Sequence, residues 1–303
     1  MATALTPESR SVDRRLKSRI LGFIALTKPR IIELLLVTTI PTMIVAANGW
    51  PGTWLVVATL AGGTAAAGGA HAINMVVDRD IDALMERTKN RPMVTGLIQP
   101  GEAMVFAITL EVAAFLFLWW QVNLLSAVLA VSATLFYVFV YTLWLKRTTE
   151  RNIVIGGAAG AVPVLVGWSA VTNTLDWAPI VLFAIIFYWT PPHFWALAIK
   201  YKDEYQAADV PMLPSTTDIR TVGIKIMMYT LLLWGLTLIF GPVADMGLVY
   251  FISALVLGAV FVWHSAQVMR VASPKVAMRL FTWSITYITL LFGAMALDQF
   301  IQV

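Results

Sequence analysis

The chain has 303 residues, of which 59% are hydrophobic and only 13% are charged, and its mean hydropathy is +0.79. This composition excludes an ordinary soluble protein and predicts an all-α, polytopic membrane protein, because the apolar runs are long and continuous instead of short and alternating as in a membrane β-barrel. The formal net charge is +4 and cysteine is absent, which excludes disulfides, thiolate metal sites and thioether haem attachment.

The chain begins with a polar segment and continues as a series of apolar runs. Residues 1–30 are expected to be a cytoplasmic arm and an interfacial lead-in without a cleavable signal peptide. Residues 31–303 are expected to form a single domain of nine transmembrane helices around a central cavity. The predicted spans are residues 31–48, 54–76, 102–120, 123–143, 153–171, 178–199, 221–241, 247–268 and 280–300. Runs of small residues at 61–70 and 156–161 predict close packing between helices.

The positive charges predict the orientation of these spans. With the amino terminus inside, all 21 Lys and Arg residues fall in cytoplasmic segments, whereas the external side carries only Asp176, Asp245 and Asp298. By the positive-inside rule the amino terminus is cytoplasmic, and with nine spans the carboxyl terminus is external. The basic charge therefore reflects membrane topology, and nucleic acid is not an expected partner.

The first long cytoplasmic connection begins with an acidic cluster. If the preceding helix continues to about Glu86, then Asn74, Asp78 and Asp82 share one helix face at i, i+4 and i+8, while Asp80 points elsewhere. An amide and two carboxylates on one face suit Mg²⁺, which takes oxygen ligands and commonly shares them with substrate phosphates. The cations that follow, which suit phosphate oxygens, are Arg87, Lys89 and Arg91. This stretch predicts a Mg²⁺-diphosphate site at the cytoplasmic membrane surface.

A second acidic cluster opens the connection at residues 200–220. It offers Asp203, Glu204 and the more distant Asp209 to a second Mg²⁺. Two carboxylate clusters facing each other would bind a diphosphate through bridging metal ions, which neutralise the leaving group as its bond to carbon breaks. The competing interpretation is that each loop is a solvated surface with ion pairs such as Lys200 with Glu204. Two such loops on one side, one of them with Asn-x₃-Asp-x₃-Asp, favour the metal site.

All three histidines lie within predicted spans, and two of them, His71 and His193, precede the acidic clusters. His71 precedes Asp78 by seven residues, on nearly the same helix face and about 10 Å deeper. His193 follows two prolines and lies about 15 Å before Asp203 along a helix; paired prolines free backbone carbonyls, as in broken spans that line a cavity. An isolated histidine in a membrane is more often a hydrogen-bonded structural residue than a ligand. The structural role is therefore the favoured interpretation of His193, whereas His71 fits a structural role or a ligand role equally well.

Several motifs together resemble a known family. Asn74-x₃-Asp78-x₃-Asp82, with Arg87-Thr88-x₂-Arg91-Pro92, resembles the first signature of the intramembrane UbiA-type prenyltransferases. The acidic motif alone specifies only this superfamily. Four further stretches resemble its haem-farnesylating branch, the haem O synthases: LTKPR at 26–30, NIVIGGAAG at 152–160, WTPPHFWALA at 189–198 and VPMLP at 210–214.

The resemblance implies a reaction and a set of site residues. The reaction transfers a farnesyl group from farnesyl diphosphate to a vinyl group of haem b, with addition of water, to give haem o and diphosphate. Mg²⁺ is the implied cofactor, and the implied metal ligands and catalytic residues are Asn74, Asp78, Asp82, and Asp203, Glu204 or both. Asp209 falls where the family has Gly or Asn, which makes it a weaker ligand. The residues implied to bind the outer diphosphate oxygens are Arg87, Arg91, Lys146, Arg147 and Lys202.

The acceptor end of the site and the cellular setting also follow from the resemblance. We expect His71 or His193 to orient the haem, through the iron or a propionate. The enzyme is expected in the cell membrane with its active-site loops on the cytoplasmic side. A later haem-modifying oxidase, haem A synthase, is expected to consume the product.

Two other functions compete with this one. A UbiA-type prenyltransferase for a quinone precursor or another aromatic acceptor would share the acidic loops, but it gives no reason for the His-Phe-Trp and Pro-Met-Leu-Pro stretches. A membrane transporter with an acidic cytoplasmic vestibule belongs to a different class. Transporters more often carry their ionisable residues at mid-membrane, whereas here they gather at one interface.

Overall fold

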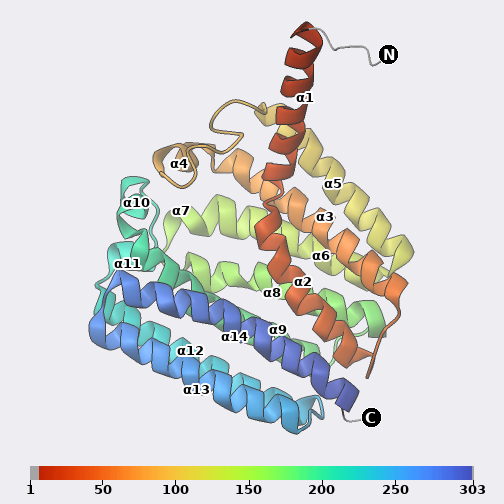
Figure 1. The fold of residues 1–303 in the computed structure, drawn as a ribbon, viewed down its shortest axis with the longest axis vertical. Helices are drawn as coiled ribbons and strands as arrows, with labels where there is room; N and C mark the ends of the chain where they lie inside the picture. Colours follow the sequence, from red (N-terminus) through yellow and green to blue (C-terminus); the bar gives the residue numbers. More distant parts are fainter. Residues whose placement is uncertain (1–6, 302–303) are drawn as a thin grey trace.

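The computed structural model describes the backbone of residues 7–301 and the side chains of residues 16–29 and 37–301. All regular structure in that part of the chain is helical (Figure 1). The long helices are α1 (Pro7–Leu26), α2 (Pro29–Ala46), α3 (Thr53–Val77), α5 (Pro100–Gln121), α6 (Leu124–Leu135), α8 (Asn152–Thr172), α9 (Trp177–Lys200), α12 (Ile219–Val243), α13 (Leu248–Val271) and α14 (Pro274–Ile301). The short helices are α4 (Arg79–Leu84), α7 (Lys146–Thr148), α10 (Lys202–Ala207) and α11 (Leu213–Thr216). A π-helix, η1 (Phe136–Leu145), joins α6 to α7.

The membrane-spanning helices agree with the predicted ones. Eight helices in the described chain are long and apolar enough to cross a membrane, and they coincide with the predicted spans from 54–76 onward. The first predicted span, 31–48, coincides with α2, but the side chains of residues 30–36 lie outside the described residues. The all-α, multi-pass fold is confirmed, whereas the count of nine spans and the cytoplasmic amino terminus remain predictions.

The helices close into a ring. Consecutive long helices from α2 to α14 pack against each other, and α14 returns to contact both α2 and α9. Helix α2 also packs across the ring against α8. Helix α1 projects beyond the bundle, and the short helices α4 and α10 lie at the same end of it (Figure 1). The first acidic cluster begins at the end of α3 and continues into α4, and the second begins on α10, so this arrangement brings both to one side of the molecule.

Small residues let neighbouring helices approach closely, both at Gly69, within the predicted run at 61–70, and at Gly167, outside the predicted runs. A Cβ atom added at Gly69 of α3 would lie 3.0 Å from the carbonyl oxygen of Ala107 on α5. A Cβ atom at Gly167 of α8 would lie 3.0 Å from the carbonyl oxygen of Thr39 on α2. Because no larger residue fits at these distances without displacing backbone, the two glycines fix how α3 and α8 pack against their neighbours.

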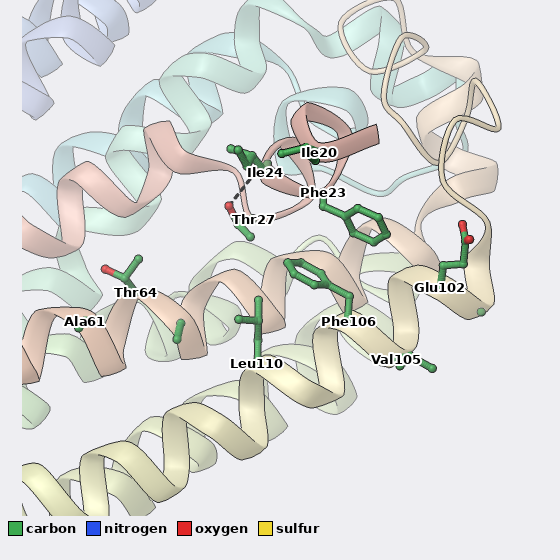
Figure 2. Close-up of a pocket in the computed structure, with 12 residues that line it drawn as sticks. Ile20, Phe23, Ile24, Thr27, Ala61, Thr64, Glu102, Val105, Phe106 and Leu110 are labelled. Atoms are coloured by element: carbon green, nitrogen blue, oxygen red, sulfur yellow. Dashed lines mark hydrogen bonds between the residues drawn. The ribbon is translucent and has the colours of Figure 1, made fainter. Parts of the chain in front are cut away.

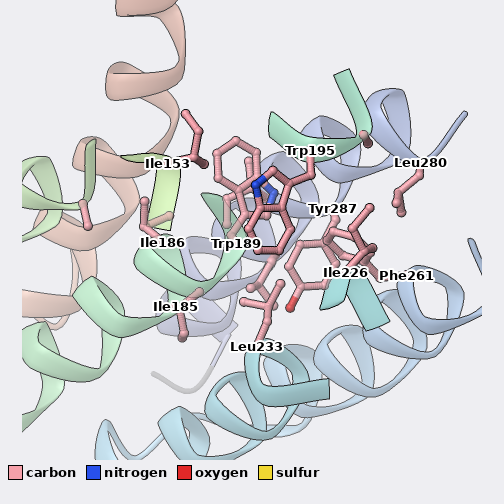
Figure 3. Packing of buried hydrophobic residues seen from close by; sticks show 14 of the residues in the cluster. Ile153, Ile185, Ile186, Trp189, Trp195, Ile226, Leu233, Phe261, Leu280 and Tyr287 are labelled. Atoms are coloured by element: carbon pink, nitrogen blue, oxygen red, sulfur yellow. The ribbon is translucent and has the colours of Figure 1, made fainter. Parts of the chain in front are cut away.

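The main hydrophobic core lies between α8, α9, α12, α13 and α14. Trp189 and Trp195 of α9 are buried there with Phe261 and Tyr287 (Figure 3). The indole nitrogen of Trp189 donates a 2.8 Å hydrogen bond to the carbonyl oxygen of Ser284 on α14. This packing fixes the end of α9, from which α10 and the second acidic cluster follow.

Candidate functional site

The first acidic cluster lies at a break in the helix. Helix α3 ends at Val77 and α4 spans Arg79–Leu84, so the prediction of one continuous helix to about Glu86 is wrong. The hydrogen-bond ladder nevertheless continues: Asp78 N donates to Asn74 O at 2.9 Å, and Asp82 N donates to Asp78 O at 2.8 Å. The common face therefore persists, with all three side chains buried while Asp80 is exposed.

Positively charged or amide donors surround these buried oxygens. Asn74 Nδ2 donates to Asp78 Oδ2 at 2.7 Å, and Asp78 also pairs with Lys146. Arg91 donates to Asp82 Oδ2 at 2.5 Å. The other carboxylate oxygen of Asp78, Oδ1, is buried without a hydrogen-bond partner among the described residues. The site thus combines buried carboxylates, covering cations and one oxygen with free lone pairs.

Lys28 is a site residue that the sequence analysis did not single out. It occupies the turn between α1 and α2 with a left-handed backbone conformation, at a φ of 51°. Its Nζ donates to Asn74 Oδ1 at 2.8 Å. Burial lowers the pKa of Lys28 to about 7, and the positive charges of Arg91 and Lys146 add to this effect. The only signal in the sequence is a Lys-Pro-Arg motif distant from the acidic cluster.

The π-helix η1 supports the amide of Asn74. Thr142 Oγ1 donates to the carbonyl oxygen of Tyr137, five residues earlier, at 2.9 Å. Because this bond uses the hydroxyl proton, Thr142 Oγ1 acts as the acceptor for Asn74 Nδ2, which lies 3.1 Å away. The amide of Asn74 is therefore oriented with its nitrogen toward Thr142 and its oxygen toward Lys28. Rare π-helical segments often occur at functional sites.

Arg147 clamps the exposed side of the same cluster. Its guanidinium donates two hydrogen bonds to Asp80, at 2.7 and 2.8 Å, and a third to the carbonyl oxygen of Val77 at 3.1 Å. The hydrogen bond from Arg147 lowers the pKa of Asp80 to about 2. Its Nη2 also lies 3.7 Å from Asp78 Oδ1. Arg147 thus ties α7 to the start of α4.

The acidic residues of the second cluster differ in how deeply they are buried. Glu204 is half-buried and its Oε2 is buried without a hydrogen-bond partner among residues 16–29 and 37–301, whereas Asp203 and Asp209 are exposed. Asp209 has a φ of 52°, a left-handed conformation that Gly, Asn and Asp adopt most readily. Among the described residues no three His, Cys, Asp or Glu side chains lie close enough together to hold a metal ion. The two clusters lie on one side of the molecule (Figure 1).

Arg87 connects the two clusters. It donates to the hydroxyl of Tyr205 on α10 at 3.2 Å, and its guanidinium carbon lies 5.7 Å from the centre of that ring and 5.9 Å from the centre of the Tyr201 ring. Lys89 instead pairs with Glu86 on the exposed surface at 2.6 Å, and Lys202 is half-buried at the start of α10. Among the predicted phosphate-binding cations, Arg91, Lys146 and Lys202 are half-buried, whereas Arg87, Lys89 and Arg147 are exposed.

The two histidines have different surroundings. His71 Nδ1 is buried and has no hydrogen-bond partner in the described part of the chain, and its ring meets the edge of Tyr137 with centroids 5.7 Å apart. His193 is stacked between Trp189 and Phe281, with centroid distances of 4.3 and 4.6 Å. Both rings lie within the bundle, but only His71 belongs to the helix that carries the acidic face.

The hydrogen bonds of Ser284 define the tautomer of His193. The Ser284 hydroxyl donates to the carbonyl oxygen of Phe281 at 2.7 Å. It therefore accepts from His193 Nδ1, which is 2.7 Å away, and this leaves the lone pair of His193 on Nε2.

An apolar groove of about 950 Å³ lies between α1, α3 and α5 (Figure 2). Phe23 and Phe106 form part of its wall, with ring centroids 5.1 Å apart. Thr27 also lines it and is adjacent in sequence to Lys28. The groove offers hydrocarbon surface next to a turn that contacts the acidic face.

Comparisons with solved structures agree with this fold. A digeranylgeranylglyceryl phosphate synthase aligns with a TM-score of 0.78 at 15% identity, over 94% of this chain and 99% of that one. A UbiA homologue from Archaeoglobus fulgidus bound to GPP and Mg²⁺ aligns with a TM-score of 0.65 at 15% identity, over 90% of this chain and 99% of that one. At this level of identity the likeness concerns the fold.

Sequence comparisons find relatives that are about half identical to this chain. The chain is 48% identical to a protohaem IX farnesyltransferase of Streptomyces avermitilis, over 98% of this chain and 100% of that protein. It is 51% identical to a protein of the same name from Parafrankia sp., over 93% of this chain and 91% of that protein. The pattern of the UbiA prenyltransferase family matches residues 35–291. With a family match across most of its length and the family's fold, the chain belongs to the UbiA prenyltransferases.

Proposed function

We propose that this membrane enzyme transfers a farnesyl group from farnesyl diphosphate to a vinyl group of haem b, with addition of water, to give haem o and diphosphate. The observation that carries the proposal is the buried face of Asn74, Asp78 and Asp82 covered by cations at one end of the bundle. The named farnesyltransferases that are about half identical over nearly the whole chain support haem as the acceptor.

The acidic face fits a hard divalent cation. Asp78 and Asp82 are buried carboxylates, and no described residue donates a hydrogen bond to Asp78 Oδ1. Asn74, Asp78 and Asp82 would hold Mg²⁺, and Glu204, with its own unpartnered buried oxygen, is better placed than Asp203 to contribute from α10. When bound, Mg²⁺ withdraws charge from the diphosphate and makes it a better leaving group.

The cations around this face would bind the outer diphosphate oxygens. Lys28, Arg91 and Lys146 approach from three different segments, and Arg87 lies between the two loops. Guanidinium and ammonium groups fixed around the leaving group stabilise negative charge as it develops there. Lys28 comes from the α1–α2 turn and Lys146 from α7, so the proposed diphosphate site depends on both segments.

Aromatic rings beside the acidic face would protect the allylic cation. Tyr137 and Tyr141 of η1 are stacked with centroids 5.4 Å apart, and Tyr137 contacts His71. Ring faces attract a cation, and a dry wall keeps water from the carbocation until a haem vinyl carbon attacks it. The farnesyl chain would lie between spans, in contact with hydrocarbon.

We place the haem near His71. This residue lies on α3, which also carries Asn74, and its buried Nδ1 has no hydrogen-bond partner that the structure describes, whereas His193 is enclosed by two rings and hydrogen-bonded to Ser284. The Nε2 lone pair of His193 keeps it a second candidate. His71→Ala is expected to weaken haem binding and shift its absorption bands more than His193→Ala does. Unchanged binding and spectra in both variants would contradict a histidine contact.

The test of the function is a reaction with purified enzyme in lipid nanodiscs. With farnesyl diphosphate, Mg²⁺ and haem b, we expect diphosphate release together with a haem product whose mass has gained a farnesyl group and water. The matched control replaces haem b by an aromatic quinone precursor, and no product is expected from it. Prenylation of the precursor but not of haem would support a quinone-pathway enzyme, and no transfer to either would favour a transporter.

The setting of the enzyme is part of the same proposal. The acidic loops would work at the cytoplasmic face of the cell membrane, with haem b and farnesyl diphosphate as the bound partners. A haem-modifying oxidase such as haem A synthase would consume the product.

A further inference from the structure

The candidate metal ligands already have partners in the protein. Asp78 pairs with Lys146, and Arg91 Nη1 lies 2.5 Å from Asp82 Oδ2. The side-chain amide of Asn74 can bind a metal only through its oxygen, Oδ1. This oxygen accepts a hydrogen bond from Lys28 Nζ. The three residues of the first cluster, Asn74, Asp78 and Asp82, are thus each held by a nitrogen donor from another segment.

The two ion pairs are asymmetric in burial. The side chains of Asp78 and Asp82 are 0% and 3% exposed, whereas those of Lys146 and Arg91 are 15% and 23% exposed. The cations therefore cover the carboxylates from the more open side. A buried carboxylate without a counter-charge is strongly unfavourable, so these pairs neutralise the acidic face of the free enzyme. Long, partly exposed side chains can also move without disturbing the helices that carry them.

We propose that Lys146 and Arg91 are exchangeable counter-ions of the acidic face. In the free enzyme they neutralise Asp78 and Asp82; when a metal–diphosphate complex enters, the two carboxylates turn to the metal and the two cations turn to the diphosphate. This inference rests on the proposed function and adds an order of binding to it. Positive charge in the pairs opposes a metal ion that arrives alone, but it attracts a complex whose net charge is negative.

The proposed exchange predicts opposite changes in the affinity for a divalent metal alone and in the affinity for the metal–diphosphate complex. Removing one cation frees a carboxylate, so a divalent metal should bind more tightly to the free enzyme. The same removal takes a charge away from the diphosphate, so metal–diphosphate should bind more weakly. A cation that only supported the fold would lower both affinities, and a cation that only bound diphosphate would leave the metal affinity unchanged.

The experiment measures binding of Mn²⁺, a paramagnetic substitute for Mg²⁺, to the full chain in nanodiscs. In Lys146→Met and in Arg91→Met we expect the affinity for Mn²⁺ alone to rise by about tenfold, the effect of removing one nearby charge in a partly screened site. Inorganic diphosphate in the presence of Mg²⁺ should bind at least about tenfold more weakly to both variants. Lys225→Met removes a cation from an exposed pair with Glu150, 3.8 Å away, and should change neither affinity.

The result that overturns the proposal is Mn²⁺ affinity equal to or below that of the parent in both methionine variants. Lys146→Arg retains the charge and should retain the parental Mn²⁺ affinity. If the methionine variants fail to fold, as size-exclusion profiles would show, Lys146→Gln provides the same charge removal with a polar side chain. Because neither titration contains haem or farnesyl diphosphate, the exchange can be upheld in a protein that fails the farnesyl-transfer assay, which would contradict only the proposed function.

Discussion

Asp78 and Asp80 are two residues apart and have opposite environments. Asp78 is fully buried and carries an oxygen that has no hydrogen-bond partner within the described chain, whereas Asp80 is exposed and held by Arg147. Asp78→Asn keeps the shape of the side chain but removes a metal ligand, and we expect Mg²⁺-dependent diphosphate release to fall by about 100-fold. Asp80→Asn is the matched control and should retain most activity. Equal activity of Asp78→Asn and the parent would remove the case for a metal at this face.

The adjacent acids of α10 allow a second comparison. Glu204→Gln removes a half-buried carboxylate with an unpartnered oxygen, whereas Asp203→Asn changes an exposed one. We expect Glu204→Gln to raise the Mg²⁺ concentration needed for half-maximal activity by about tenfold or more, within the usual range for loss of a metal-site group. Asp203→Asn should leave it nearly unchanged. The reverse order would assign the metal to Asp203.

These residues show where sequence reasoning is sufficient and where it is not. The i, i+4, i+8 spacing correctly separates Asn74, Asp78 and Asp82 from Asp80, because the hydrogen-bond ladder continues through the break at Asp78. Spacing could not choose between Asp203 and Glu204, since neighbouring residues differ in burial only once α10 has docked. It also gave no reason to bring Lys28 to Asn74, because that contact joins residues 46 positions apart.

The π-helix is the element that the sequence did not reveal. Residues 136–145 form an apolar run in which a span was correctly predicted, but an apolar run does not indicate whether its hydrogen bonds are i→i+4 or i→i+5. Here the polar Thr142 bonds to the backbone five residues earlier and to Asn74. The register of η1 is thus linked to the acidic face by tertiary contacts.

Thr142 provides a test of that link. Thr142→Val keeps the size of the side chain but removes both hydrogen bonds, and we expect a stability loss of about 1–3 kcal/mol, the cost of leaving buried polar groups without partners. We also expect lower kcat, because the Asn74 amide loses its orientation. Thr142→Ser restores the hydroxyl and should recover activity. Thermal unfolding in detergent and the rate of diphosphate release measure the two effects, and a fully active Thr142→Val would show that η1 does not position Asn74.

The packing of α2 against α8 leads to a prediction about one glycine. A Cβ atom at Gly167 would lie 3.0 Å from a backbone oxygen of α2, whereas a Cβ atom at Gly160 on the same helix would meet no atom within 4 Å. Gly167→Ala should therefore destabilise the protein by about 1–3 kcal/mol through overpacking. Gly160→Ala should be neutral or stabilise it by up to about 1 kcal/mol, because alanine loses less backbone entropy in a helix. The measurement compares the thermal unfolding temperatures of the two variants. Equal temperatures would mean that α2 shifts to make room for the added methyl group at Gly167.

At the scale of the whole molecule, composition was the most informative feature of the sequence. Long apolar runs are enough to predict an all-α, multi-pass protein, because a backbone in lipid must satisfy its own hydrogen bonds. The order of helices around the ring was not predictable in this way, since packing in a membrane depends on small residues and shape instead of on hydropathy. The ring nevertheless brings α4 and α10 to one end of the bundle (Figure 1), where both acidic loops were expected to lie.

The cytoplasmic orientation of the end that carries α4 and α10 is a prediction that cysteine labelling can test. No cysteine is present, so one introduced cysteine gives an unambiguous label. Leu175 is exposed in the turn between α8 and α9, and Ala207 is exposed at the end of α10. The positive-inside rule places the first outside the cell and the second in the cytoplasm. In intact spheroplasts, a membrane-impermeant maleimide should therefore label Leu175→Cys but not Ala207→Cys, and permeabilised cells should show labelling of both. The opposite pattern would reverse the topology and place the acidic loops, with Arg87 and Tyr205 between them, on the external face.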